Sequence, residues 1–247
     1  MWEGFANAFG QRCAVHFLGL WDTVNSIGWV WDPFMLPHTT NNPSVKFVRH
    51  AVSIDEHRAF FRQHLWGPGK YGEDVKQVWF AGDHCDVGGS HPERESGLSQ
   101  IALEWMVEQA EAAGLLVDQN LRSVVIPKPG SPKPGYAAAG EPEAPEPPDH
   151  LGPVHNSLTP VWWPAEFVPK RFFDPQDGWK RKHRMNLFHP RFIPSAPKPR
   201  VHQSVVVRMS KDPTYRPTNL LRLGNEYDVE AWPRAPVTPM AEVRVVA

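Results

Sequence analysis

The stretch VWFAGDHCDVGG, from Val78 to Gly89, decides how this sequence is interpreted. It opens as an apolar run of the kind that fills a buried strand, and the run stops at a histidine that a glycine pair follows. Strand ends in open α/β sheets hold reactive side chains on rigid supports. We therefore interpret residues 75–81 as a strand and His84 as a catalytic base placed just after it.

A second apolar run, Val15 to Trp21, ends in the carboxylate of Asp22. A catalytic histidine needs a carboxylate that fixes its tautomer and stabilises the imidazolium formed in the reaction. Because both residues follow strands, their side chains can converge at one edge of a sheet. We predict that Asp22 is the catalytic acid and that its carboxylate lies within hydrogen-bond reach of His84.

Asp55 is the rival acid, because it follows another strand at 45–54 and lies between Asp22 and His84 in the sequence. For Asp55 we prefer a salt bridge to Arg58 or Arg62. The alternative for His84 itself is a structural histidine with satisfied hydrogen bonds.

Cys85 stands beside His84, which raises a cysteine–histidine nucleophile as an alternative. Neighbours in a strand point to opposite faces, so we prefer a buried structural thiol. Asp86 fits either a partner in the second layer of the site or a turn residue. Together with His84 and His91 it has metal-ligand chemistry, but three ligands in one glycine-rich turn are a weak signal. We expect no metal and no cofactor.

The nucleophile is missing from these segments. In α/β-hydrolases the chain order is nucleophile, acid, histidine, and the serine lies in a Gly-x-Ser-x-Gly elbow. Ser90 comes nearest, with Gly88 two residues before it, but Pro92 stands where the second glycine belongs. Ser90 also follows the histidine. The sequence therefore supplies two of the three members of a triad.

Strand and helix patterns place the chain in the α/β class. Besides the three strands, residues 97–113 carry apolar side chains at helical spacing, and Gly114 is a suitable C-terminal cap. We predict a further strand at Val201–Met209 and an ordered loop at 212–220. Near-continuous apolar strands alternating with helices are typical of a sheet covered on both faces.

Composition excludes several classes of protein. The 247 residues are 41% hydrophobic with a formal net charge of −1. This balance gives the chain no net positive charge that would attract nucleic acid. The cluster Lys180–Arg184 is interpreted as a solvated loop, with a phosphate or lipid-headgroup site as the alternative. No apolar run reaches the roughly 20 residues of a membrane span, and there is no signal-peptide pattern. Cys13 and Cys85 cannot form a disulfide framework.

Four ordered blocks resemble the α/β-hydrolase domain of type VI secretion phospholipase effectors, a family long catalogued as a domain of unknown function. The blocks are FLGLWDTV (Phe17–Val24), RHAVSIDEHR (Arg49–Arg58), VWFAGDHCDVGG (Val78–Gly89), and HQSV (His202–Val205) with YRPTNL (Tyr215–Leu220).

This resemblance implies a lipid esterase or phospholipase that uses a Ser-Asp-His triad, with Asp22 as the acid and His84 as the base. The family's serine elbow and the first strands of its sheet precede the Asp22 block. The expected fold is thus the C-terminal part of an α/β-hydrolase sheet, inactive alone. The alternative is a noncatalytic interaction module that retains the scaffold.

The domain expectations follow. Residues 1–126 form the C-terminal half of the hydrolase core with an aromatic lid-like insert at 25–43. Residues 127–160, which hold ten prolines, form a linker or surface excursion, and 161–247 complete the same domain and add a tail. The implied partners are a phospholipid or other ester substrate and a secretion-apparatus or immunity protein. The chain is expected to be made in the cytoplasm and exported by type VI secretion without a signal peptide.

Overall fold

A five-stranded parallel sheet organises the computed structural model, which describes residues 10, 13–24, 28–29, 32–33, 41–131, 144–171 and 183–233. The strand order is β1-β4-β5-β8-β9, and every neighbouring pair is parallel. The bounds are β1 (Val15–Trp21), β4 (Val45–Ser53), β5 (Asp74–Phe80), β8 (Arg200–His202) and β9 (Asp228–Glu230). With helices on its flanks, this sheet confirms the expected α/β class.

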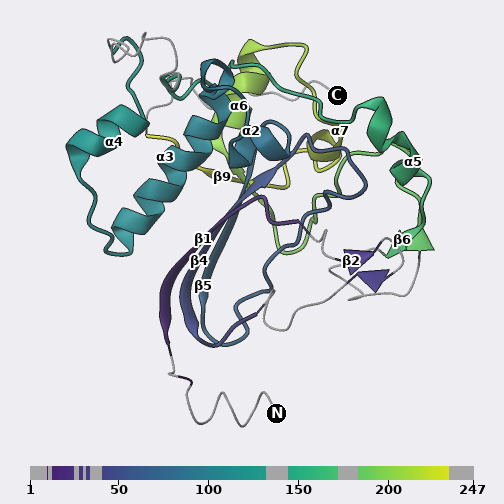
Figure 1. Cartoon of the computed structure of the whole chain (residues 1–247), viewed down its shortest axis with the longest axis horizontal. Helices are drawn as coiled ribbons and strands as arrows, with labels where there is room; N and C mark the ends of the chain where they lie inside the picture. The colour runs from purple at the N-terminus through teal and green to yellow at the C-terminus, as the bar shows by residue number, and fades with distance from the viewer. Residues whose placement is uncertain are drawn as a thin grey trace.

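Helices cover both faces of the sheet. The predicted helix at 97–113 is confirmed as α3 (Gly97–Ala112), and Gly114 follows it with φ of 102°, a left-handed conformation that favours glycine. The other face carries α6 (Gln203–Lys211) and α7 (Thr218–Leu221). In Figure 1, α3 and α4 (Gln119–Val125) lie on one side of the strands, opposite α5 (Trp163–Glu166).

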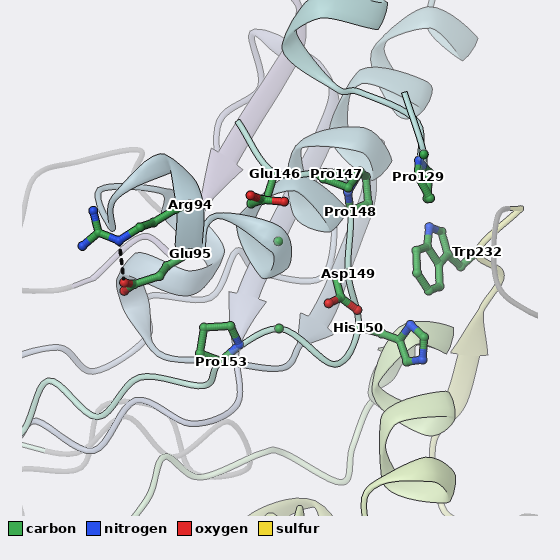
Figure 2. Close-up of a pocket in the computed structure, with 13 residues that line it drawn as sticks. Arg94, Glu95, Pro129, Glu146, Pro147, Pro148, Asp149, His150, Pro153 and Trp232 are labelled. Atoms are coloured by element: carbon green, nitrogen blue, oxygen red, sulfur yellow. Dashed lines mark ion pairs between the residues drawn. The ribbon is translucent and has the colours of Figure 1, made fainter. Parts of the chain in front are cut away.

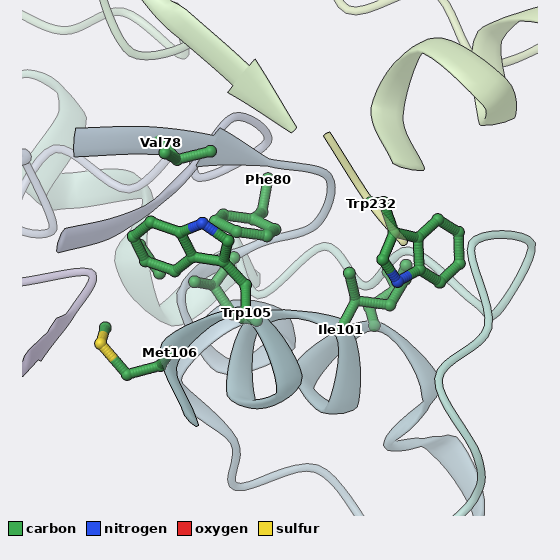
Figure 3. Close-up of a cluster of buried hydrophobic side chains, with 10 residues drawn as sticks. Val78, Phe80, Ile101, Trp105, Met106 and Trp232 are labelled. Atoms are coloured by element: carbon green, nitrogen blue, oxygen red, sulfur yellow. The ribbon is translucent and has the colours of Figure 1, made fainter. Parts of the chain in front are cut away.

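Side chains at alternate positions of the central strands belong to two separate hydrophobic clusters, one on each face of the sheet. Val78 and Phe80 of β5 point toward α3, where they meet Ile101, Trp105 and Met106 (Figure 3). Val52 of β4, Trp79 of β5, and Ile54 and Ala81 just after these strands face the other way. They pack against α6 and α7, where the cluster includes Val205, Met209 and Leu220. Burial on both faces explains why these strands are almost continuously apolar.

The predicted strand at Val201–Met209 is wrong in its greater part. Strand β8 ends at His202, which caps α6 by accepting a hydrogen bond from the backbone N–H of Ser204 at its side chain. Val205 and Met209 lie one helical turn apart and are both buried. Valines favour strands by propensity, but here the cap and this spacing prevail. The loop expected at 212–220 also contains the first residues of α7.

Several short elements complete the described residues. Two antiparallel pairs of two-residue strands occur, β2 (Gly28–Trp29) with β3 (Asp32–Pro33) and β6 (Lys170–Arg171) with β7 (His183–Arg184). The single 3₁₀ turns are η1 (Glu93–Glu95) and η2 (Pro160–Trp162). Most of the lid-like insert expected at 25–43 lies outside the described residues.

The second half of the proline-rich stretch runs along the folded domain. The backbone N–H of Glu146 donates to Ser96 Oγ, and that of Asp149 donates to Gly97 O at the start of α3. Further on, His155 and Ser157 bond to carboxylates at the start of the helix after β5. Residues 132–143 lie outside the described residues.

Candidate active site

Asp22 lies where β1 ends, at the carboxyl edge of the sheet. Its backbone N–H donates to Ala51 O of the neighbouring strand, and its φ is 42°, in the left-handed region that few side chains other than Asn and Asp adopt. This sharp turn away from the strand places the carboxylate inside the domain, and Asp22 is fully buried. Its Oδ1 accepts a hydrogen bond from the backbone N–H of Ser53 at 2.8 Å.

His84 is the first residue of a short helix, α2 (His84–Gly88), which corrects the expectation of a glycine-rich turn. Asp83 caps this helix by accepting from the N–H groups of Cys85 and Asp86, and Asp86 accepts in return from the N–H of Asp83. Such a reciprocal capping box between residues three positions apart favours the start of a helix, and here it prevails over the glycines that follow. It fixes the point at which His84 leaves the backbone.

The structure brings Asp22 and His84 together, as the strand-end argument predicted. His84 Nδ1 lies 2.7 Å from Asp22 Oδ2, and Glu56 Oε2 accepts the backbone N–H of His84 at 3.2 Å. The ring of Phe61 packs edge-on against the imidazole, with ring centroids 5.1 Å apart. The His84 side chain remains 27% exposed, so a reactant can reach the ring. The catalytic roles of the two residues stay a prediction.

Arg191 joins this pair from 169 residues away in the chain. Its guanidinium contacts both carboxylate oxygens of Asp22, with Nη2 at 2.9 Å from Oδ2, and Nη1 also donates to Ser53 Oγ. Burial opposes ionisation of Asp22, but the charge of Arg191 and the hydrogen bonds to the carboxylate outweigh it. The pKa of Asp22 therefore lies well below its usual range, and the group stays anionic.

Asp55, the rival acid, lies at the end of the next strand in a different environment. Its Oδ2 accepts hydrogen bonds from Gly82 N and Tyr215 Oη, both at 2.7 Å. Burial raises the pKa of Asp55 to about 6 in spite of these bonds.

The preferred salt bridge of Asp55 is not what the structure has. Arg58 pairs with Glu56 through two bonds of 2.9 and 2.7 Å, and Arg62 donates to Asn186 Oδ1 at 2.8 Å. Two hydrogen-bond donors from elsewhere in the fold take the place of the expected cation at Asp55.

Cys85 is partly buried in α2 rather than fully buried in a strand. Burial and the charge of Asp83 raise the pKa of its thiol, which disfavours the thiolate that a nucleophile requires. These contacts oppose a cysteine–histidine nucleophile.

Carboxylates and histidines gather behind α2. Asp86 Oδ1 lies 2.7 Å from His155 Nδ1, and Glu95 Oε2 lies 3.0 Å from the other ring nitrogen. His91 stacks on His155 with ring centroids 3.7 Å apart, and its Nε2 lies 3.3 Å from Asp83 Oδ1. These contacts raise the pKa of His155 against the opposing effect of burial. The cluster ties residues 153–157 to the helix that carries His84.

Two sets of three residues within this cluster have ligand atoms close enough for a metal ion: Asp83, Cys85 and His91, and Asp86, His91 and His155. The set of His84, Asp86 and His91, which the sequence offered only as a weak alternative, is not among them. In the second set a metal would have to lie in the plane of both imidazoles, and the stacked rings of His91 and His155 do not converge in that way. Both nitrogens of His155 also have carboxylate partners already. In the first set the pKa of the Cys85 thiol is raised, which disfavours the thiolate that binds a metal.

Three supporting residues escaped the sequence analysis. Arg191 follows no motif, and only the fold brings it to Asp22. Glu56 lies inside a matching block, yet nothing in the sequence separates it from Asp55. His50 is fully buried and its Nε2 lies 3.0 Å from the N–H of Thr23, the residue after Asp22. Burial lowers the pKa of His50 to about 4, so it stays neutral as an acceptor.

Two hollows lie near α3. One of about 580 Å³ is bordered by Trp21, next to Asp22, and by Val87 and Gly88, which follow His84 in α2. The other, of about 460 Å³, is lined by the prolines at 129, 147, 148 and 153, and its far end is bordered by His150 and Trp232 (Figure 2). Neither Asp22 nor His84 borders either hollow, but the first is bordered by residues near them in the sequence, Trp21 and Val87. Among the described residues, no serine hydroxyl is hydrogen-bonded to the His84 ring.

Within the described residues, no helix has the length and apolarity needed to cross a bilayer.

Comparison with known proteins gave one family and one relative. Residues 1–109 match the family model described as the type VI secretion system (T6SS) phospholipase effector Tle1-like catalytic domain. The Saccharomyces cerevisiae protein named uncharacterized protein YEL023C is 44% identical over 71 residues, which cover 28% of this chain and 10% of that protein. The chain therefore spans about a tenth of the length of this relative. No solved structure matches the chain.

The matched segment contains Asp22, Asp55 and His84, whereas Arg191 and the last resembling block at 202–220 lie beyond it. The resemblance expected from the sequence is thus confirmed over residues 1–109, which match the catalytic domain of the Tle1-like phospholipase effectors of type VI secretion.

Proposed function

We propose that this chain carries the acid and the base of a serine-type lipid esterase or phospholipase, with Asp22 as the acid and His84 as the base. The observation that carries the proposal is the 2.7 Å contact between His84 Nδ1 and Asp22 Oδ2, inside a segment that matches a phospholipase family. The substrate class is a membrane glycerophospholipid or a related ester.

The chemistry follows from the protonation states. With Nδ1–H donating to Asp22, the other ring nitrogen of His84 takes the proton of an attacking hydroxyl and later returns it to the leaving alcohol. The imidazolium formed between these steps is stabilised by the buried carboxylate. Because Arg191 keeps Asp22 ionised, the proton stays on the imidazole. Arg191 is therefore a positioning residue for the acid.

The nucleophile is proposed to come from a serine elbow outside these 247 residues. Two observations support this: the sequence has no Gly-x-Ser-x-Gly motif, and in the described part no serine bonds to His84. Loss of a nucleophile costs several orders of magnitude in rate, so the chain alone is expected to be inactive. Export by type VI secretion and recognition by an immunity protein belong to the same proposal.

Hydrolysis of a fluorogenic phospholipid tests this assignment. The purified chain should give no release above buffer, whereas a longer protein that joins a serine elbow to the N-terminal side of this chain should hydrolyse the lipid. In that longer protein, His84→Ala should lower kcat by about 10³-fold or more. Cys85→Ala is the matched control in α2 and should leave the rate unchanged.

Hydrolysis by the 247-residue chain that His84→Ala abolishes would refute the claim that the serine comes from elsewhere. If the longer protein is inactive, or keeps its rate when His84 is replaced, the acid–base assignment is wrong. The scaffold would then act as a noncatalytic interaction module.

A further inference from the structure

Residues 153–157 lie against the helix that carries His84, and we call this segment the strap. The backbone N–H of His155 donates to Asp86 Oδ2 at 2.9 Å, and the Nδ1 atom of its ring lies 2.7 Å from Asp86 Oδ1. Two residues later, Ser157 Oγ donates to Asp83 Oδ2. The strap is thus attached to both carboxylates of the capping box that starts α2.

The geometry of the His155 ring requires a positive charge on it. Nδ1 faces Asp86, and Nε2 lies 3.0 Å from Glu95 Oε2, so each ring nitrogen has a carboxylate oxygen as its partner. An ionised carboxylate only accepts hydrogen bonds, and a neutral imidazole has a single N–H to donate. Both contacts are therefore hydrogen bonds only when the ring is an imidazolium. Burial lowers the pKa of His155, but the bonds to Asp86 and Glu95 outweigh it and raise the pKa.

The two carboxylates of the capping box need this charge. Asp83 and Asp86 are no more than 2% exposed, and buried anions are unfavourable unless cations compensate for them. The charge of Arg58 acts on Asp83, and His91 Nε2 lies 3.3 Å from Asp83 Oδ1. At Asp86, His91 Nε2 is 3.6 Å away, farther than the Nδ1 of His155. His155 is thus the closer cationic partner of Asp86.

The strap has space to move away from α2. Val154, His155 and Asn156 border a hollow of about 300 Å³, and Pro153 borders the proline-lined hollow. Val154 is partly buried and packs against the hydrophobic cluster around α3. The bonds between the His155 ring and its two carboxylates can therefore decide whether the strap stays on α2.

The ionisable groups around His155 come from two sides. They are Asp83, Asp86, His91, Arg94 and Glu95 from α2 with its cap and the turn and η1 after it, and Asp55, His57, Tyr215 and Arg216 across the 300 Å³ hollow. The two carboxylates that contact the His155 ring both belong to the first side. Their attraction for an imidazolium therefore draws the strap toward α2.

We propose that His155 is a positioning residue that holds the strap on α2 as an imidazolium and releases it as a neutral ring, which loosens the turn that carries His84. The inference rests on the proposed function only where it concerns His84 as the base, because attachment of the strap is a property of this chain that needs no catalysis.

The direction of the pH dependence follows from the raised pKa. The folded-state pKa of His155 lies above the unfolded value of about 6.5. The stabilising contacts of the ring are therefore complete below about pH 6.5, and they are lost as pH rises through the folded-state pKa. Alkaline conditions should release the strap, and mildly acidic conditions should hold it.

Hydrogen exchange of the 247-residue chain, measured by NMR from pH 6 to pH 9, tests the proposal. Each rate is divided by that of an unstructured peptide at the same pH, which removes the pH dependence of the exchange reaction itself. Protection of the His155 N–H, which donates to Asp86, should fall about tenfold or more over this range. Protection of the Asp83 N–H, which also donates to Asp86, should fall with it.

Three variants sharpen the test. In His155→Gln, which cannot take up a proton, both N–H groups should exchange fast at pH 6 already and show no pH dependence. Glu95→Gln replaces a carboxylate that is 34% exposed by a neutral amide, so the imidazolium is less favoured and the fall should occur at lower pH. His189→Gln changes an exposed histidine outside the cluster and is the matched control, which should behave like wild type.

Constant protection of the wild type from pH 6 to pH 9 overturns the proposal, as does a fall that persists unchanged in His155→Gln. A fall that disappears in His91→Gln but remains in His155→Gln would assign the proton to the neighbouring ring and overturns it as well. None of these outcomes depends on hydrolysis. Failure of the strap is therefore distinguishable from failure of the acid–base assignment, which the lipid assay decides.

Discussion

Asp22 and Asp55 follow neighbouring parallel strands at the same edge of the sheet, yet the fold gives them opposite protonation behaviour. Asp22 is fully buried beside the guanidinium of Arg191, and its pKa is far below the usual range. Asp55 is partly buried with only neutral donors, Gly82 N and Tyr215 Oη, in contact, and its pKa is raised to about 6. Both carboxylates lose solvent, but only at Asp22 do a neighbouring cation and the hydrogen bonds from His84, Arg191 and Ser53 outweigh the effect of burial.

This contrast separates the two candidate acids by a physical criterion. An acid that stabilises an imidazolium must itself be anionic, and Asp22 meets that condition at all pH values where the domain is expected to function. No histidine contacts the carboxylate of Asp55, and its pKa of about 6 means that it becomes protonated as pH falls below neutral. Both residues follow a strand, so this position alone cannot tell which of them is the acid.

Removal of Arg191 should give the largest effect. Arg191→Met leaves the carboxylate of Asp22 buried without its cation, and we expect a loss of about 3–5 kcal/mol in the free energy of unfolding. Urea denaturation at pH 7 measures it.

A double-mutant cycle serves as the control for Arg191. Asp22→Asn removes the charge that Arg191 compensates, so the double variant should be clearly less destabilised than the sum of the two single variants. Additive losses would mean that the pair is not coupled and that the contrast with Asp55 has another origin.

Replacement of Asp55 by asparagine should change how stability depends on pH. The pKa of Asp55 is higher in the folded state than in the unfolded chain, so its contribution is complete below about pH 4 and declines as pH rises to about 6. The decline amounts to about 3 kcal/mol. Relative to wild type, Asp55→Asn should therefore gain stability by this amount between pH 4 and pH 7 in denaturation experiments.

Tyr215→Phe is the companion variant for Asp55. It removes a donor that favours the carboxylate, so the pKa of Asp55 should rise further and the decline should extend to higher pH. A pH dependence identical in wild type and Asp55→Asn would show that the pKa of Asp55 is not raised in the folded state.

His50 should give a smaller effect in the opposite direction. Burial lowers its folded-state pKa to about 4, so the neutral ring contributes stability above the unfolded pKa of about 6.5 that is lost as pH falls toward 4. From pH 7 to pH 5 the loss is about 2 kcal/mol.

His50→Gln tests that acid sensitivity, because the glutamine cannot take up a proton. Its free energy of unfolding should fall by about 2 kcal/mol less than that of wild type over the same pH interval. Equal slopes would show that the pKa of His50 is not lowered in the folded state.

Much of the sheet could be predicted from the sequence, because burial on both faces leaves a continuous apolar signal. Strands β1, β4 and β5 and helix α3 start and end within one residue of the predicted bounds. The prediction of a strand from Val201 to Met209 is wrong because the valines of this segment are compatible with a strand by propensity and with a helix by spacing. Only the cap at His202, which needs the fold around it, decides between them.

The candidate site was only partly predictable. The convergence of Asp22 and His84 follows from parallel strands that end at one edge, a rule of topology. Arg191 reaches Asp22 from a loop without any motif, and the donors to Asp55 come from Gly82 and Tyr215. Long-range partners of this kind decide the protonation states, which is why the sequence could rank Asp22 above Asp55 but could not predict their opposite pKa shifts.

The left-handed backbone conformation of Asp22 matters for directed evolution of this protein. Glycine at position 22 would relieve a conformational cost of about 1 kcal/mol or less. It would also leave the buried guanidinium of Arg191 without its carboxylate and Ser53 N without its acceptor, at a cost of about 3–5 kcal/mol. A library selected for heat resistance alone should therefore keep the acid at this position, even without selection for turnover.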